Sequence, residues 1–409
     1  MNLLNRGIVT LAIPLLFVAL PANAQDSPIY VQCPPTTDLH PSGDGIKCVH
    51  LSGGDGVATM ADDDAEEMYI FSFAEIPLPA DAGVPANEYP GFAMEQGMLA
   101  AEAPAPTIVV DEDDELFLTL TNVGMVMRPD LFDPHTVHWH GFPEASSVFD
   151  GVPDASISVN MGASLTYYYL AKDAGTYMYH CHVEATEHMQ MGMLGNLWVR
   201  PRQNKLPDDT DLNGFTHQTG FTYAYNDGDG STRYDVEYPI QIGSFDPDFH
   251  DASFEVQPLP FAAMEDRYFL LNGRGYPDTV NAGVISTVDP LGAVQESQPV
   301  TSLVTANPDE KILLRISNLN VTVFNTLATN GPPMLVVGRD ARLLRDGAGA
   351  NMYYSTNSLT LGGGQSADVI IDTTGLTSGQ TFFLYTTNLD RLANDDENFG
   401  GMMTEIRIN

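Results

Sequence analysis

Two short stretches decide how this chain is interpreted: His135-Thr136-Val137-His138-Trp139-His140-Gly141 and Tyr179-His180-Cys181-His182. Together with the residues that follow the second stretch, they hold six of the ten histidines and one of the three cysteines. On a β-strand, neighbouring side chains point to opposite faces, and side chains two residues apart share a face. If both stretches are strands, this alternation sorts their polar side chains into two sets.

The first set is built around Cys181. This side chain points away from the face that its two neighbouring histidines share, and His135, an odd number of residues from His138, points away from that histidine. We expect His188 and Met193, from the loop that follows, to join His135 and Cys181. Two imidazoles, a thiolate and a weak axial thioether are the ligands of a blue-copper electron-transfer site.

The second set consists of four histidines that share one face: His138, His140, His180 and His182. Four imidazoles converging on one face suit further copper with open positions for a substrate. The two sets together predict copper as the cofactor.

The bulk composition indicates an acidic protein with two domains. A chain of 409 residues, 43% of them hydrophobic, is long enough to bury two ordinary cores. It carries 54 Asp and Glu against 17 Lys and Arg, a formal charge of -37, which argues against nucleic acid or anionic membrane surfaces as partners. The charge suits docking to a basic electron-transfer partner, but a solvated acidic surface is the favoured interpretation.

Residues 1–24 have the pattern of a secretory signal peptide. Arg6 precedes the apolar run Ile8–Leu20, and Ala22-Asn23-Ala24 forms a small-residue cleavage pattern. We therefore expect a periplasmic or secreted protein with no membrane span once the signal is removed. In an oxidising compartment Cys33 and Cys48 can pair as a disulfide, which leaves Cys181 as a metal ligand.

The rest of the chain is predicted to be all-β. Residues 25–66, rich in Pro, Gly, Ser and Asp, are expected to form a loop-rich extension. Short strand-like runs with Gly and Pro punctuation, and no convincing helix, predict a first sandwich over 67–203 and a second over 236–409, joined by a linker at 204–235.

The second half offers few metal ligands. It has no cysteine, and its single histidine, His250, is assigned a structural role. His217 is predicted to be an exposed linker residue. The run Asn226–Ser231 lacks the spacing of a calcium loop, and Gly362-Gly363-Gly364 is predicted to be a turn.

The chain resembles the multicopper oxidases of the cupredoxin superfamily, in a two-domain form that lacks the usual third copper-binding domain. Beside the histidines, the resemblance is carried by these stretches: Ala105–Val110, Leu118–Asn122, Asp150–Pro153, Ala174–His182 and Leu271–Thr279. It implies two cupredoxin-like Greek-key β-sandwich domains, the second without copper ligands.

The resemblance also implies roles for individual residues. The type 1 copper ligands, where electrons enter, correspond to His135, Cys181, His188 and Met193. A type 2 ligand corresponds to His138, and type 3 ligands of the cluster that reduces dioxygen correspond to His140, His180 and His182.

Two departures from the family pattern stand out. His188 lies seven residues after Cys181, where the family usually has five, so a longer loop must reach the copper. The family's trinuclear cluster uses four His-x-His pairs, and this chain has two. Either another subunit supplies the other half, or the cluster does not form. Homotrimeric two-domain relatives carry the missing pairs in their second domain, which here lacks them.

These observations favour an oxidoreductase that takes electrons at type 1 copper and reduces dioxygen if a homo-oligomer or partner subunit completes the cluster. The electron donor is a small molecule, a metal ion or a redox protein. One alternative is a type 1 copper electron-transfer protein without turnover. Another is a nitrite reductase-like enzyme, although His138 stands where that family has an aspartate.

Overall fold

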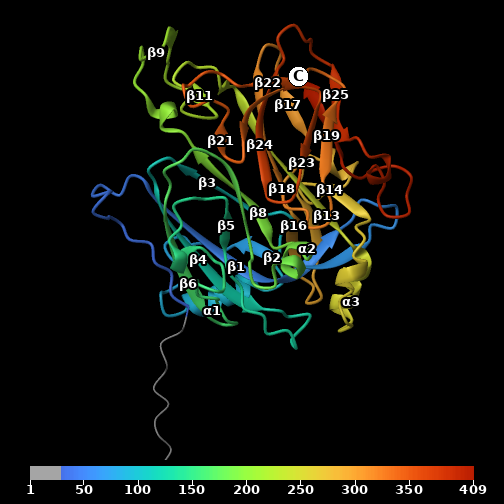
Figure 1. Ribbon diagram of the computed structural model, residues 1–409. Coiled ribbons are helices and arrows are strands. Elements are labelled where there is room, and N and C mark those ends of the chain that lie inside the picture. The colour runs from blue at the N-terminus through green and yellow to red at the C-terminus, as the bar shows by residue number, and fades with distance from the viewer. Residues whose placement is uncertain (1–28) are drawn as a thin grey trace, which may run out of the picture.

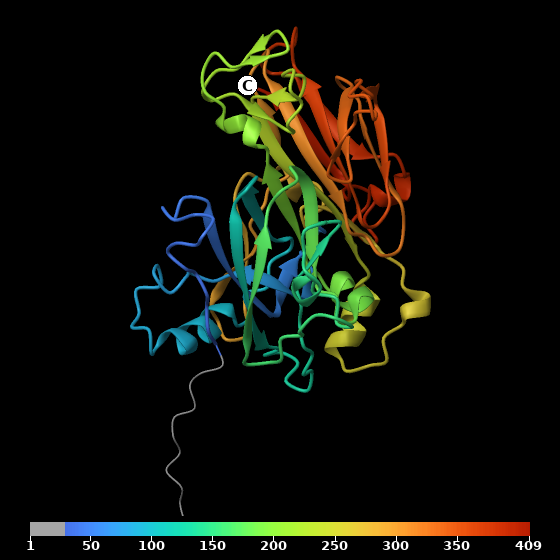
Figure 2. The ribbon, with the colours of Figure 1, turned by 60° about the vertical axis from the view of Figure 1, so that its left-hand side comes forward.

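The computed structural model describes residues 29–409, and Figures 1 and 2 show two β-sandwiches in contact. The first sandwich contains a four-stranded sheet in the order β2-β1-β4-β6. Its strands are β1 (Ile46–Thr59), β2 (Glu67–Glu75), β4 (Glu115–Gly124) and β6 (Ser164–Leu170). Facing it is a sheet in the order β3-β8-β7-β5. This sheet is made of β3 (Ala105–Asp111), β5 (His138–His140), β7 (Gly175–His180) and β8 (Leu194–Arg200).

The expectation that 25–66 is a loop-rich extension is wrong for its second half. Residues 46–59 form β1, which pairs with β2 on one side and in parallel with β4 on the other. Glycines at 53, 54 and 56 weakened the strand signal, because glycine is unfavourable in strands unless another group approaches closely. The predicted disulfide between Cys33 and Cys48 is present and fastens the preceding loop to β1. The signal peptide predicted for residues 1–24 lies outside the described residues.

The second sandwich follows a linker of small hairpins. These hairpins are β9 (Asp211–Leu212), β10 (Phe215–Thr216), β11 (Thr222–Tyr223) and β12 (Arg233–Tyr234). One sheet of the sandwich contains β13 (Val236–Phe245), β14 (Tyr268–Leu271), β18 (Lys311–Asn318), β20 (Met334–Arg339), β21 (Arg342–Leu343), β22 (Tyr354–Thr356) and β24 (Gln365–Asp372). The other contains β17 (Val304–Ala306), β19 (Asn325–Thr329), β23 (Ser358–Leu361), β25 (Thr381–Thr386) and β26 (Met403–Ile408). The hairpin β15 (Ile285–Val288) and β16 (Val294–Gln298) completes this half. The predicted all-β, two-sandwich class is confirmed.

Short helices occur where the sequence predicted none. They are α1 (Tyr89–Gly97), α2 (Ala185–Gln190) and α3 (Pro247–Phe254), with 3-10 turns at Ser147–Phe149, Arg202–Lys205, Phe261–Ala263, Asp278–Val280 and Leu389–Arg391. In α3 the Asp246 carboxylate accepts the Phe249 backbone N–H, and Pro247 occupies the first turn, where it costs no hydrogen bond. Six to nine residues give too few turns for helical periodicity to show in the sequence. Among residues 29–409, no helix is long and apolar enough to cross a membrane.

The two sandwiches are joined by a buried polar network. Arg315 on β18 is fully buried and pairs with Asp368 on β24 and with Glu237 on β13. Thr176 on β7 donates a hydrogen bond to Asp368 at 2.6 Å. Breaking a buried charge pair leaves an uncompensated charge, so this network holds β7 firmly against the second domain.

Candidate metal centre

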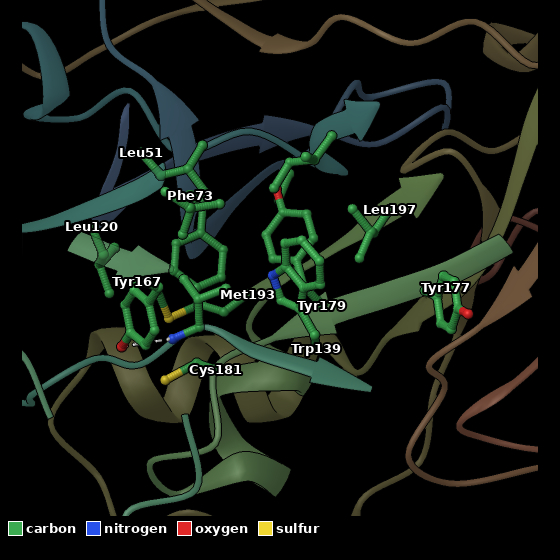
Figure 3. Close-up of a cluster of buried hydrophobic side chains, with 14 of the residues drawn as sticks. Leu51, Phe73, Leu120, Trp139, Tyr167, Tyr177, Tyr179, Cys181, Met193 and Leu197 are labelled. Atoms are coloured by element: carbon green, nitrogen blue, oxygen red, sulfur yellow. Dashed lines mark hydrogen bonds between the residues drawn. The ribbon is translucent and has the colours of Figure 1, made fainter. Parts of the chain in front are cut away.

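The first predicted set of ligands meets at Cys181. The Nδ1 atom of His188 lies 3.1 Å from the Cys181 sulfur, and the Thr136 backbone N–H donates to that sulfur at 3.4 Å. Possible ligand atoms of His135, Cys181 and His188 all lie within 4.8 Å of one another. All three side chains are fully buried. Figure 3 shows Cys181 among the buried side chains of the first core, with Met193 and Trp139.

His135 and Met193 complete this arrangement. Neither ring nitrogen of His135 has a hydrogen-bond partner among the described residues, although the ring is fully buried. The backbone N–H of Met193 donates to His188 O, and its carbonyl accepts the Cys181 N–H. A Cβ placed on Gly53 would lie 2.9 Å from His135 Cδ2 and 3.5 Å from the Met193 methyl carbon, so the two side chains meet over β1. Unpaired buried imidazole nitrogens beside a thiol fit a copper ion.

Electrostatics favour a thiolate at Cys181. Burial alone raises the pKa of the thiol, but the neighbouring His188 and His135 outweigh it and hold the pKa well below its ordinary value. Burial lowers the pKa of His188, but the Cys181 thiolate and Asp133 oppose this and raise it to about 10. The Asp133 carboxylate lies 3.6 Å from His188 Nε2, the nitrogen that faces away from the sulfur. A carboxylate in this position orients a ligating histidine.

The long spacing between Cys181 and His188 is absorbed by a helix. The sequence predicted His188 in a loop, but it lies in α2, which Glu184 opens in a left-handed conformation with φ of 45°. A helical turn adds residues to the loop with little increase in its length, because a helix rises only about 1.5 Å per residue. The extra residues therefore still leave His188 in contact with the sulfur.

The four histidines of the second set share one face, as the alternation predicted. β5 and β7 pair so that His138 lies directly opposite His180, with ring centres 5.2 Å apart. His182 lies beyond the end of β7, and its ring centre is 5.1 Å from that of His138. Possible ligand atoms of His138, His140 and His180 lie within 4.8 Å of one another. Trp139, between the two β5 histidines, faces the core and stacks on Tyr169.

Hydrogen bonds direct one nitrogen of these rings toward the shared space. His138 Nδ1 donates to Asp150 O at 2.6 Å, and His180 Nδ1 donates to Cys181 O at 2.7 Å, which leaves both Nε2 atoms free of a proton. His180 Nε2 lies 3.4 Å from His140 Nδ1. Burial lowers the pKa of His138 and of His140, and it lowers the pKa of His180 to about 3. Neutral imidazoles are the form that binds metals.

A cavity of about 400 Å³ lies beside the four rings. On one side it is lined by α2, and on the other by Leu319, Asn320, Val321, Gly363 and Gly364 of the second domain. A Cβ on Gly364 would lie 2.5 Å from His140 Nε2, so the predicted glycine turn packs against this ring. None of the second-domain residues lining the cavity is a histidine, cysteine or carboxylate.

The remaining histidines lie elsewhere. His217 was predicted to be exposed, and this is wrong: its ring is fully buried and bonds to the Tyr223 hydroxyl, because the linker folds into hairpins with a small core. His250 is buried and structural, as predicted. His50 bonds to two hydroxyls inside the first sandwich, and His40 bonds to Asp113 O at the surface loop.

Comparison with known proteins agrees with this geometry. The family model described as Multicopper oxidase matches residues 93–204, which include both ligand sets. Residues 93–204 therefore resemble a multicopper oxidase domain. This domain is similar to the multicopper oxidase MCE of Talaromyces pinophilus, at 33% identity over 28% of this chain and 18% of that protein. It is also similar to laccase-1 of Emericella nidulans, at 35% identity over 26% of this chain and 16% of that protein. The matches therefore span less than a fifth of these relatives.

Solved structures extend the likeness in fold to both sandwiches. The blue copper oxidase of Nitrosomonas europaea aligns with a TM-score of 0.61 and 20% identity over 89% of this chain and 86% of that one. The copper nitrite reductase of the same organism aligns with a TM-score of 0.54 and 16% identity over 89% and 94%. At these identities the likeness shows the cupredoxin-like fold of the chain.

Three residues that shape the candidate metal centre were not predicted from the sequence. Gly53 makes room for His135, but the glycines around it hid the strand, so the sequence did not signal this close approach. Asp133 precedes His135 by two residues, but nothing local pointed it at His188. Gly151 was noted only as part of a stretch that carries the family resemblance. Its physical role is to allow a close contact, because a Cβ there would lie 2.2 Å from Val137 O, on the segment leading into β5.

Proposed function

We propose that this protein is a copper-dependent oxidoreductase of the multicopper oxidase type. The observation that carries the proposal is the segment His180-Cys181-His182, whose middle residue belongs to one ligand set and whose outer residues belong to the other. Type 1 copper would accept one electron at a time from a donor, and type 2 and type 3 copper would supply the reduction of dioxygen to water. The short covalent path from Cys181 to His180 and to His182 suits electron transfer between the two copper sites.

The chain's own residues bind and orient. His135, Cys181, His188 and Met193 would hold type 1 copper in a dry pocket, with Asp133 orienting the His188 ring. His138, His140, His180 and His182 line the open cavity, where they would hold type 2 and type 3 copper. The rings of His138 and His180 are oriented by the Asp150 and Cys181 carbonyls, so these two rings need little rearrangement on binding.

The second centre is the part of the site for which we propose a partner. Two His-x-His pairs line the cavity, and its second-domain wall adds no further ligand. We propose that a second copy of this chain or another subunit supplies the missing donors, and that the electron donor is a small molecule, a metal ion or a redox protein. Two observations support a periplasmic or secreted location: the predicted signal at 1–24 and the disulfide between Cys33 and Cys48.

Copper content measured together with oligomeric mass tests this function. The copper-loaded protein is sized in solution, its copper is counted per chain, and oxygen uptake is followed with a phenolic or ferrous donor. About four coppers per functional unit with oxygen uptake supports the oxidase. No uptake in any oligomeric state rules it out.

The absence of ligands on the second-domain wall favours one alternative, a type 1 copper electron carrier. One tightly held copper per chain, a reversible blue absorbance and no oxygen uptake would support it. A nitrite reductase-like activity is a second alternative, which turnover of nitrite by the copper-loaded protein would support.

A further inference from the structure

The second domain holds the helix that carries His188. Gln190, two residues after His188 in α2, is almost fully buried and has polar contacts with the second domain at both its side chain and its backbone. Its side-chain amide donates to Asp266 Oδ1 at 3.2 Å. Its backbone carbonyl lies 3.1 Å from His250 Nε2. The second domain, which carries no proposed copper ligand, therefore contacts α2 at two atoms of Gln190, the side-chain amide nitrogen and the backbone carbonyl oxygen.

His250 reaches this position because α3 leaves its own sandwich. In Figures 1 and 2 α3, drawn in yellow, lies beside the first sandwich, and it contacts β2 there. The other ring nitrogen of His250, Nδ1, is 2.6 Å from Tyr69 O on β2. Burial lowers the pKa of His250 to about 4, so the ring is neutral near pH 7 and its one N–H bonds one carbonyl while the ring packs against the other. The His250 imidazole thus lies between β2 and α2 and contacts a backbone carbonyl of each.

Asp266 is itself fixed by the second domain. Its Oδ2 accepts the Ser244 hydroxyl at 2.7 Å and also the Thr322 hydroxyl. Its Oδ1 is directed at Gln190. A carboxylate held by donors on two segments cannot follow a moving helix, so its bond to Gln190 restrains α2 relative to the second sandwich.

The first domain holds the chain that follows Gln190, and it also packs against the His188 ring. Phe71 N–H donates to Met191 O at 3.2 Å, and the Ser72 hydroxyl donates to Gly192 O at 2.7 Å. The Phe71 ring meets the His188 ring edge-on, with centres 5.3 Å apart. The two hydrogen bonds place the chain after Gln190 and the ring contact places the His188 side chain, whereas His250 and Asp266 place Gln190 itself.

We propose that His250 and Asp266 are positioning residues for the copper site at Cys181, and that through them the second domain sets the geometry of that site. This inference rests on the proposed function in so far as it requires copper at Cys181. Neither residue touches the ligands. Groups that orient ligands from outside the coordination shell typically change metal affinity by about 10- to 100-fold when removed.

The test compares full-length variants loaded with copper. His250→Phe removes the ring N–H that bonds one of the two carbonyls and keeps a ring of similar size, and Asp266→Ala removes the acceptor for Gln190. Asp266→Asn retains an acceptor oxygen and is the conservative rescue. His217→Phe is the control, because His217 is equally buried and is hydrogen-bonded to one hydroxyl but lies in the linker hairpins. Gln190→Met, which removes the amide and keeps the chain length, covers the case in which Asp266→Ala does not fold.

Three properties are measured: copper affinity by chelator competition, the visible absorption of the copper–thiolate bond, and the midpoint potential. We expect His250→Phe and Asp266→Ala, or Gln190→Met, to weaken copper binding about tenfold and to shift both the band and the potential. Asp266→Asn and His217→Phe should match the wild-type protein. Wild-type values in His250→Phe and Gln190→Met, or equal shifts in His217→Phe, would overturn the inference. A wild-type protein without the thiolate band would instead refute the proposed type 1 site.

Discussion

Gly53→Ala tests whether β1 shapes the copper site. The added Cβ would lie 2.9 Å from His135 Cδ2, whereas ordinary van der Waals contact begins at 3.4 Å, so the ring or the strand must move by 3.4 minus 2.9, or 0.5 Å. The neighbouring backbone is paired on both sides, with β2 and with β4, and cannot yield easily. Overpacking of a core of this kind costs about 1–3 kcal/mol. His135 is the neighbour with the most room to turn, and turning it displaces a proposed ligand.

The assay follows thermal unfolding of the first domain with and without copper. For a domain of this size, 1 kcal/mol shifts the Tm by roughly 2–4 °C, so the metal-free variant should melt about 2–12 °C below the wild-type protein. The increase in Tm on adding copper should also be smaller, because a displaced His135 binds copper less well. Gly243→Ala is the control, since a Cβ at this position in β13 would meet no atom within 4 Å.

One result would refute the reasoning. If Gly53→Ala unfolds at the wild-type temperature and gains as much from copper as the wild-type protein does, then neither the close contact nor the position of His135 matters to the site. If Gly53→Ala lowers the Tm of the metal-free protein but leaves the increase in Tm on adding copper unchanged, then β1 is tightly packed at this position but His135 is not a copper ligand.

Removing the disulfide with Cys33→Ser and Cys48→Ser should lower the free energy of unfolding by about 3 kcal/mol, as expected for a 15-residue loop; unchanged denaturant midpoints would contradict this. Asp133→Ala should weaken copper binding about tenfold relative to Asp133→Asn, since only the alanine removes an oxygen facing His188; equal chelator competition by both variants would count against that role. Burial and neighbouring carboxylates raise the pKa of Glu102 from 4.5 to about 8, so its contribution to stability is present below pH 4.5 and is lost as the pH rises through about 8. Glu102→Gln should therefore lose less Tm than the wild-type protein between pH 5 and pH 9, and parallel Tm profiles would argue against the shift.

The grouping of the candidate ligand side chains into two sets could be predicted from sequence because strand alternation is a local rule. His138 and His140 share a face whatever the rest of the chain does, and Cys181 is opposed to its two neighbours for the same reason. The pairing of β5 with β7 then brings the sets together. What the alternation could not supply was the register, which places His138 opposite His180.

The missed features depend on contacts between distant segments. β1 was hidden because its glycines lower strand propensity, and they are present because His135, Val123 and Ala101 approach the strand closely. The burial of His217 depends on a linker hairpin too short to show periodicity. The position of His250 depends on α3 crossing to the first domain, which no local pattern encodes.

The charge of the chain bears on how the second centre could be completed. Each chain carries a formal charge of -37, so two copies repel one another at long range, and added salt should strengthen their association by screening that repulsion. A basic partner would be attracted by the same charge, and salt should weaken its binding. Gly364 already packs against His140, so donors from either partner must enter through the open side of the cavity. Copper content per chain that rises with ionic strength therefore indicates completion by a second copy, whereas copper content that depends on a basic partner and falls with salt indicates a different subunit.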